Sequence, residues 1–137
     1  MTDIIWEFAE DLPSEIAPYT ILKEFGLQLG PDTKGIFNAD IVQTIKDDGS
    51  MVCSFYLVVP QLSNYSYKLM EMVQPKFFKF YPVKMSLFGK AEGNVITDVA
   101  TNPTEFRAKV AAFIANPLTK LILTALRTQI EIYNDFK

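Results

Sequence analysis

The segment GIFNADIVQTIKDDGSMVCSFYLVVP, residues 35–60, contains the pattern that decides the fold. Its first half alternates apolar and polar side chains, which is typical of a β-strand with one covered face. Its second half, residues 51–59, is apolar at nearly every position and predicts a central strand that Pro60 ends. Residues 47–50 (Asp-Asp-Gly-Ser) favour a turn between the two runs. The sequence therefore predicts an antiparallel hairpin whose second strand lies inside a sheet.

A second hairpin is predicted further along the chain. Residues 74–88 have the composition of a strand, residues 89–94 favour a turn, and residues 95–101 (VITDVAT) predict the last strand. Because Pro82 cannot donate a ladder hydrogen bond, we expect its strand to lie at an edge or to carry a bulge there. The two hairpins together predict an antiparallel sheet of about four strands.

Helical patterns surround these strands. Residues 18–29 place four apolar side chains on one face, with Pro18 in the first turn, and Gly30-Pro31 is expected to end the helix. Residues 62–73 are ambiguous, since their apolar side chains fit both a helix and a strand. Their Leu, Met, Glu and Lys content favours a helix, and this is our prediction for the segment.

Two helices are predicted near the C-terminus. Asn102 is suited to an N-cap, Pro103 to the first helical position and Glu105 to a capping box. Asn116-Pro117 repeats this pattern and begins the last helix. That helix has an unusually wide apolar face, which predicts contacts on more than one side, either with the sheet and a neighbouring helix or with the core and a partner chain. The inward residues of the first helix are predicted to be Phe106, Val110 and Phe113; the two apolar stripes of the last are Leu118, Leu121, Ile122 and Ala125, and Leu123, Leu126, Ile130 and Tyr133.

The order of these elements, strands and then helices, predicts an α+β fold with the N-terminal helix and the two C-terminal helices packed on one face of the sheet. The 137 residues fit one domain, 1–137, in which residues 1–12 are interpreted as an N-terminal arm or a short helix. Apolar residues make up 49% of the chain and charged residues 21%, which is typical of a packed globular protein.

Charge and cysteine content indicate the compartment and the class of partner. The net charge is −3, which argues against a nucleic-acid-binding protein whose entire surface is basic. The single cysteine, Cys53, cannot form an internal disulfide, and the N-terminus carries no secretory pattern, so we expect a cytoplasmic protein. No run of 18 apolar residues is present, and no membrane span is predicted.

The residues needed for most catalytic chemistry are missing from the sequence. It contains no histidine, which removes histidine-activated nucleophiles and the commonest transition-metal ligand. Cys53 lies on an apolar strand and is interpreted as a buried, inert thiol. Asp40 and Asp98 are the pair of acids weighed for acid and base catalysis, but solvated strand residues explain them better. No catalytic residue, cofactor or metal site is therefore predicted.

The stretch QPKFFKFYPVK, residues 74–84, sets lysines among aromatic residues. In a strand, Tyr81 points with the better core face, whereas Phe78 and Phe80 point the other way together with Lys76 and Lys84. Three interpretations fit this mixed face. It is a solvent-exposed surface on which lysine side chains cover the aromatic rings, a subunit interface, or a platform on which nucleic-acid bases stack.

Function is therefore a hypothesis about binding. The sequence favours a small non-catalytic module that binds another protein or associates with itself as a homodimer, with Trp6, Phe78, Phe80 and Tyr81 as aromatic anchors and Lys76 and Lys84 beside them. Tyr81 is included although it lies on the predicted core face. The first alternative is single-stranded nucleic-acid binding through residues 76–84. The second is an enzyme that uses paired carboxylates.

Overall fold

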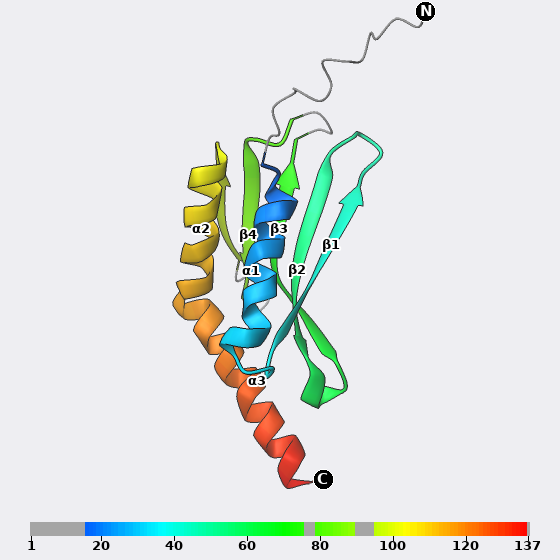
Figure 1. Cartoon of the computed structure of the whole chain (residues 1–137), viewed down its shortest axis with the longest axis vertical. Coiled ribbons are helices and arrows are strands. Elements are labelled where there is room, and N and C mark those ends of the chain that lie inside the picture. Colours follow the sequence, from blue (N-terminus) through cyan, green and yellow to red (C-terminus); the bar gives the residue numbers. More distant parts are fainter. Residues whose placement is uncertain (1–15, 76–78, 90–94, 137) are drawn as a thin grey trace, which may run out of the picture.

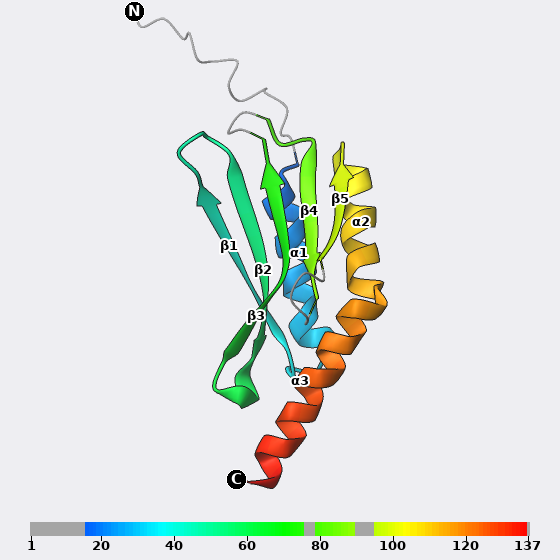
Figure 2. The same cartoon turned by 180° about the vertical axis from the view of Figure 1, so that it is seen from behind.

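The computed structural model describes residues 16–75, 79–89 and 95–136. Within them a five-stranded antiparallel sheet, with strands in sequence order, carries its helices on one face (Figures 1 and 2). The α+β class and the single helix-covered face are confirmed, and the sheet has five strands rather than about four. The elements are α1 (Pro18–Asp32), β1 (Asn38–Ile45), β2 (Met51–Val59), the 3₁₀ turn η2 (Pro60–Leu62), β3 (Tyr65–Gln74), β4 (Val83–Phe88), β5 (Val95–Ala100), α2 (Pro103–Ala115) and α3 (Pro117–Asp135).

Both predicted hairpins are present. Strand β1 pairs with β2 without interruption, and β2 lies in the interior of the sheet, between β1 and β3. In the connecting turn Gly49 has φ of +85°, a conformation that glycine adopts without strain, and the Asp48 carboxylate accepts hydrogen bonds from the backbone and hydroxyl of Ser50. Strands β4 and β5 form the second hairpin.

The helix predicted over residues 62–73 is wrong, because this segment forms strand β3. Phe55 of β2 is paired with Met70 and Tyr56 with Lys68, so Leu69 has no partner of its own and the strand carries a bulge. The bulge turns both Leu69 and Met70 towards the helices, and both are buried. Because of the bulge, the apolar residues of this segment do not alternate regularly with polar ones. The period of two that identifies a strand in a sequence is therefore lost.

Two proline-based predictions are also corrected. Helix α1 continues through Gly30 and Pro31 to Asp32, and it ends where Gly35, at φ of +79°, donates its N–H to the carbonyl of Gly30. Pro82 lies just before β4, and β4 is an interior strand between β3 and β5. Since the strand begins after Pro82, the missing N–H removes no bond from its ladder.

The core lies between the sheet and the helices. Phe106, Val110 and Phe113 of α2 are buried, as predicted, and Ile21 and Leu22 of α1 are fully buried beside the central strands. Residues that alternate along β2, β3 and β4 form the floor of this core, namely Cys53, Phe55, Leu57, Val59, Met70, Met72, Val83, Met85 and Leu87. Burial of so many apolar side chains on one face is what holds the helices to the sheet.

Both predicted caps of the C-terminal helices are confirmed. The side chain of Asn102 accepts a hydrogen bond from the backbone N–H of Glu105 at 2.8 Å, and that of Asn116 accepts one from Leu118 at 2.9 Å. Each cap satisfies a helical N–H that has no partner within the helix. The first cap fixes α2 directly after β5, which brings the polar side chains of α2 beside the edge of the sheet.

Candidate binding surfaces

The residues proposed from the aromatic stretch lie in different environments. Trp6, Lys76 and Phe78 are outside the described residues. Phe80 is half-buried and packs against the core, and Tyr81 is buried, with its hydroxyl donating to the carbonyl of Ile16 at 3.0 Å. Its ring also meets Phe106 edge to face. Little of the Tyr81 ring is therefore left for a partner.

Lys84 lies apart from these rings, exposed on β4. It is paired with Val73 of β3 and Val99 of β5, on the face of the sheet that no helix covers. The structure thus brings Phe80 and Tyr81 to the core side and leaves Lys84 on the open side.

The two acids weighed for catalysis are not brought together. Asp40 lies on β1 and Asp98 on β5, and the three interior strands separate these opposite edges. The idea that the two carboxylates face each other is therefore wrong. In the described part of the chain, no group of three or more metal-ligating side chains is present.

Cys53, the third residue of β2, is fully buried. Burial raises the pKa of its thiol to about 11, because an apolar environment disfavours the thiolate. At neutral pH the thiol is protonated and therefore unreactive, in accord with its interpretation as a buried, inert core residue.

An apolar groove lies between the C-terminal half of α3 and the start of β3. Its volume is about 670 Å³, and its lining is formed by Leu62, Tyr65, Tyr67, Ile122, Ala125, Leu126, Gln129, Ile132, Tyr133 and Phe136. None of these side chains is charged at neutral pH. Two hydrogen bonds connect the elements around the groove: Tyr67 donates its hydroxyl to the carbonyl of Phe88 at 2.9 Å, and the Asn134 side chain of α3 donates to that of Gln61 in η2 at 3.5 Å.

The wide apolar face of α3 is only partly covered by the rest of the protein. Ile122, Leu126 and Ile130 are buried against the rest of the protein, whereas Tyr133 and Phe136 remain exposed, Phe136 at 87% of its surface. The sequence indicated this face of α3. It missed the opposite wall, Tyr65 and Tyr67, because the helix predicted over residues 62–73 gave those side chains other neighbours.

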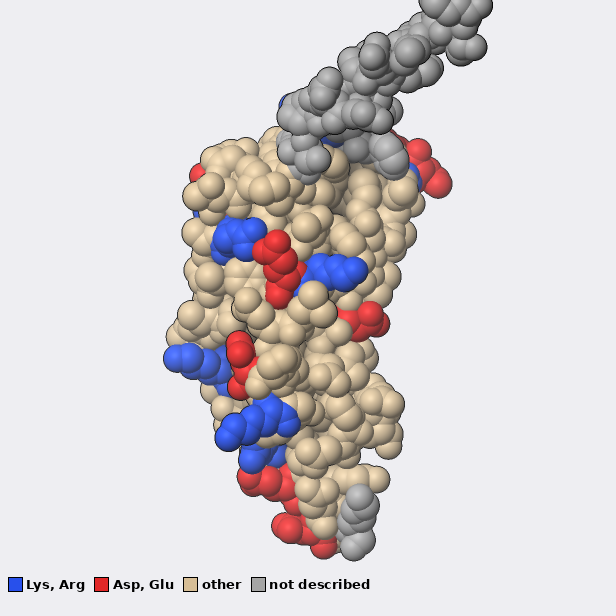
Figure 3. Space-filling view, in the orientation of Figure 1, with Lys and Arg blue, Asp and Glu red and all other residues tan. Residues whose placement is uncertain are grey.

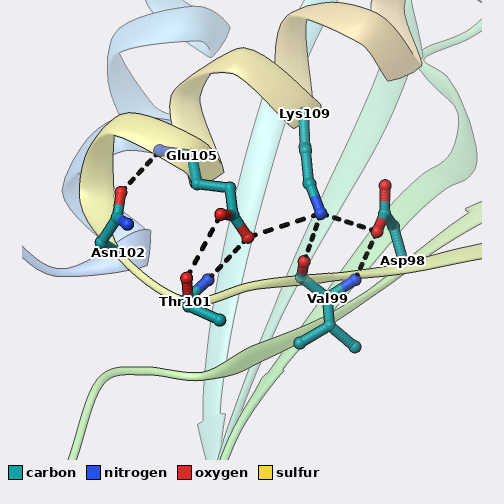
Figure 4. Close-up of polar contacts among 6 residues, drawn as sticks. All are labelled: Asp98, Val99, Thr101, Asn102, Glu105 and Lys109. Atoms are coloured by element: carbon teal, nitrogen blue, oxygen red, sulfur yellow. Dashed lines mark hydrogen bonds and ion pairs between the residues drawn. The ribbon is translucent and has the colours of Figure 1, made fainter.

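Polar side chains of the same chain bind the outer edge of β5 at its C-terminal end, around Val99 and Thr101 (Figure 4). Asp98 accepts a hydrogen bond from the N–H of Val99 at 2.7 Å, and Lys109 of α2 donates to the carbonyl of Val99. One turn earlier on α2, Glu105 accepts from the N–H and the hydroxyl of Thr101. Lys109 also pairs with Asp98 at 2.9 Å and with Glu105 at 3.4 Å, so the four side chains form one connected network.

The network shifts the pKa values of its members. The hydrogen bond from Lys109 and the one from the backbone of Val99 lower the pKa of Asp98, and the hydrogen bond from Thr101 lowers that of Glu105. Asp98 in turn raises the pKa of Lys109. All three groups are therefore charged at neutral pH, the state in which they bind the edge.

The outer edge of β1 has no such covering among the described residues. Strand β1 is an edge of the sheet, and no hydrogen bond from a described side chain or segment reaches its outer backbone groups. Lys23, on the part of α1 that lies beside β1, places its ammonium over the ring of Tyr19 instead. The two edge strands of the sheet thus differ in whether side chains bond their outer backbone groups.

Charged side chains of both signs are mixed over the helical side of the molecule (Figure 3). Among them, Arg107 of α2 pairs with Glu24 of α1 at 2.6 Å. The described residues on this side form no continuous basic track of the kind that binds a phosphate backbone. In the described part of the chain no single helix has the length and apolar composition to cross a membrane, and α2 with α3, bent by 48°, meets both criteria only as a pair.

The sequence matches no known family model, and it shows no detectable similarity to a curated protein or to a solved structure.

Proposed function

We propose that the chain is a non-catalytic protein-binding module that holds an apolar segment of another protein in the groove between α3 and β3. The observation that carries this proposal is the groove itself, whose lining is apolar and aromatic and has no charged side chain. Aromatic residues at the centre of an interface contribute much of the binding free energy. Three tyrosines and one phenylalanine belong to this lining.

The length of the groove favours a polypeptide over a small molecule. Its α3 wall runs from Ile122 to Phe136, which at a rise of 1.5 Å per residue is about 21 Å. Along this wall Ala125, Gln129, Ile132 and Phe136 recur at helical spacing, the arrangement against which an amphipathic segment packs its own apolar side chains. An uncharged lining favours an uncharged inserted face, since a buried unpaired charge is costly.

The chemistry of the chain supports binding rather than turnover. The sequence has no histidine, its one thiol is buried and protonated, and its two candidate acids lie on opposite edges of the sheet. The groove also lacks lysine and arginine, so it supports the nucleic-acid alternative less well than a protein partner.

The test is site-specific photo-crosslinking of the full chain in its own cells. A benzophenone side chain at Gln129, inside the groove, is expected to give one adduct of defined mass with a second protein. The matched control is Thr124, which is exposed on the same helix and is not part of the lining. A Gln129 adduct that disappears in the additional variant Tyr133→Asp supports the proposal. No adduct at Gln129, equal adducts at both positions, or an adduct with nucleic acid contradicts it.

A further inference from the structure

We propose that the outer edge of β1 pairs with the same edge of a second copy of this chain. Two five-stranded sheets would then join antiparallel across a two-fold axis and form one continuous sheet. This inference concerns a different surface from the groove and does not depend on the function proposed for it.

The backbone of β1 is prepared for such pairing. The strand has eight residues, and its register with β2 is continuous from Asn38 to Ile45, without a bulge. It contains neither proline nor lysine, the residues that commonly block edge strands. Alternate residues therefore present N–H and C=O groups in a straight row, and adding a strand would satisfy them.

The contrast with β5 shows that this chain has the means to close an edge. Val99 and Thr101 have their outer groups bonded by Asp98, Lys109 and Glu105, and a strand added there would have to displace these bonds. Because a two-fold axis pairs β1 with itself, association through β1 uses up this edge in both copies and ends at two, and the bonded end of β5 offers no equivalent site at Val99 and Thr101.

Apolar side chains surround the open edge. Val42 is 43% exposed on the sheet face without helices, and Ile45 is exposed at the end of the strand. Helix α1 lies close along β1, since a Cβ atom at Gly26 would lie only 3.0 Å from the Ile41 side chain and 3.2 Å from that of Ala39. Leu27, the next residue of α1, is 70% exposed beside the same strand. The two-fold axis would bring Leu27 of each copy towards the seam.

A second copy fits this edge because the strand complements itself. In an antiparallel pair, side chains directly opposite share a face, so the axis must pass through a residue position and not between two. With the axis at Val42, Val42 meets its own copy, Ile41 meets Gln43 and Asp40 meets Thr44. Asp40 is the only charged residue of β1, and this register keeps it away from its symmetry mate.

Sedimentation velocity of the full chain tests the proposal. The wild type is expected to sediment as a dimer at micromolar concentration. Val42→Lys and Val42→Glu each place like charges at the axis and are expected to raise the dimer dissociation constant by roughly 100-fold or more. An equimolar mixture of the two variants is expected to restore a dimer, because a lysine then meets a glutamate.

Val99→Lys is the matched control, since Val99 is 44% exposed on the same sheet face, at the β5 edge. It should leave the dimer unchanged, and circular dichroism should show that every variant folds. A monomeric wild type, a Val42→Lys variant that remains dimeric, or a dimer lost equally in Val99→Lys would overturn the proposal. If the wild type is a monomer whose β1 edge binds a strand of another protein, the proposal that β1 pairs with a second copy of this chain is likewise excluded.

Discussion

At the end of β5 the backbone groups of Val99 and Thr101 are bonded to side chains of their own chain, whereas no described side chain bonds the outer backbone groups of β1. The difference follows from which helix adjoins each strand. Helix α2 begins directly after β5, and its residues 105 and 109, four apart, lie on the same face above the edge. Helix α1 places Lys23 beside β1, but the ammonium of Lys23 lies over the ring of Tyr19 and makes no described bond to the β1 edge.

Edge protection in this sheet depends on a few residues that are close together in the sequence. It needs one acid on the strand, one capped helix immediately after it, and a glutamate and a lysine one turn apart. Since unprotected edges invite association with other strands, a chain that closes one edge and leaves the other open limits where pairing occurs. In the proposed dimer, this asymmetry directs pairing to the β1 edge.

The largest effect is expected when the closed edge is opened. The double variant Asp98→Ala/Lys109→Ala removes the bonds to the N–H and carbonyl of Val99, so both edges of the sheet become available. We expect assemblies larger than a dimer, measured by light scattering and by the binding of an amyloid-sensitive dye during storage at neutral pH.

The matched control for this variant is Arg107→Ala with Glu24→Ala, which removes an exposed ion pair of α2 without touching the edge. That control should keep the wild-type size distribution. If the double variant at the β5 edge also keeps it, the bonds to Val99 do not protect the edge, and the comparison between the two edges loses its meaning.

A smaller effect is expected on the titration of Asp98. Its pKa in the folded state lies below the ordinary value of 3.8, because Lys109 and the N–H of Val99 bind the carboxylate. A lowered folded pKa means that the stabilisation is present above about pH 3.8 and is lost as the pH falls through the lower folded value. The edge should therefore open only in strong acid.

Carbon-detected NMR of the Asp98 carboxyl measures this midpoint directly. We expect a midpoint below 3.8 in the wild type and a rise towards that value in Lys109→Ala. An unchanged midpoint in Lys109→Ala would show that the lysine does not hold the carboxylate in solution.

Features that depend on neighbours in the sequence could be predicted from it. The turn at residues 47–50, the caps at Asn102 and Asn116 and the inward side of α2 each depend on a few adjacent residues, and all are confirmed. Strand β3 could not be recognised in the same way, because the bulge at Leu69 breaks the alternation that identifies strands. Because β3 was not predicted as a strand, Tyr65 and Tyr67 could not be recognised as one wall of the groove.

The edges show the limit of sequence reasoning most clearly. Asp40 and Asp98 look alike in the sequence, as single acids on strands, and were considered together as a catalytic pair. Only the strand order shows that they occupy opposite edges, and only the packing of α2 shows that Asp98 has Lys109 beside it. The apolar face of α3 was visible from its periodicity, but which part of it stays uncovered depends on β3 and η2.

Residue-resolved amide hydrogen exchange at two protein concentrations distinguishes a paired β1 edge from an unpaired one. We expect the β1 amides that are not bonded to β2 to exchange slowly at high concentration and faster on dilution or in Val42→Lys. The amides of Val99 and Thr101 should be protected equally at both concentrations, because their partners belong to the same chain. If the outer β1 amides exchange at the rate of unpaired amides at every concentration, β1 does not pair with a second copy.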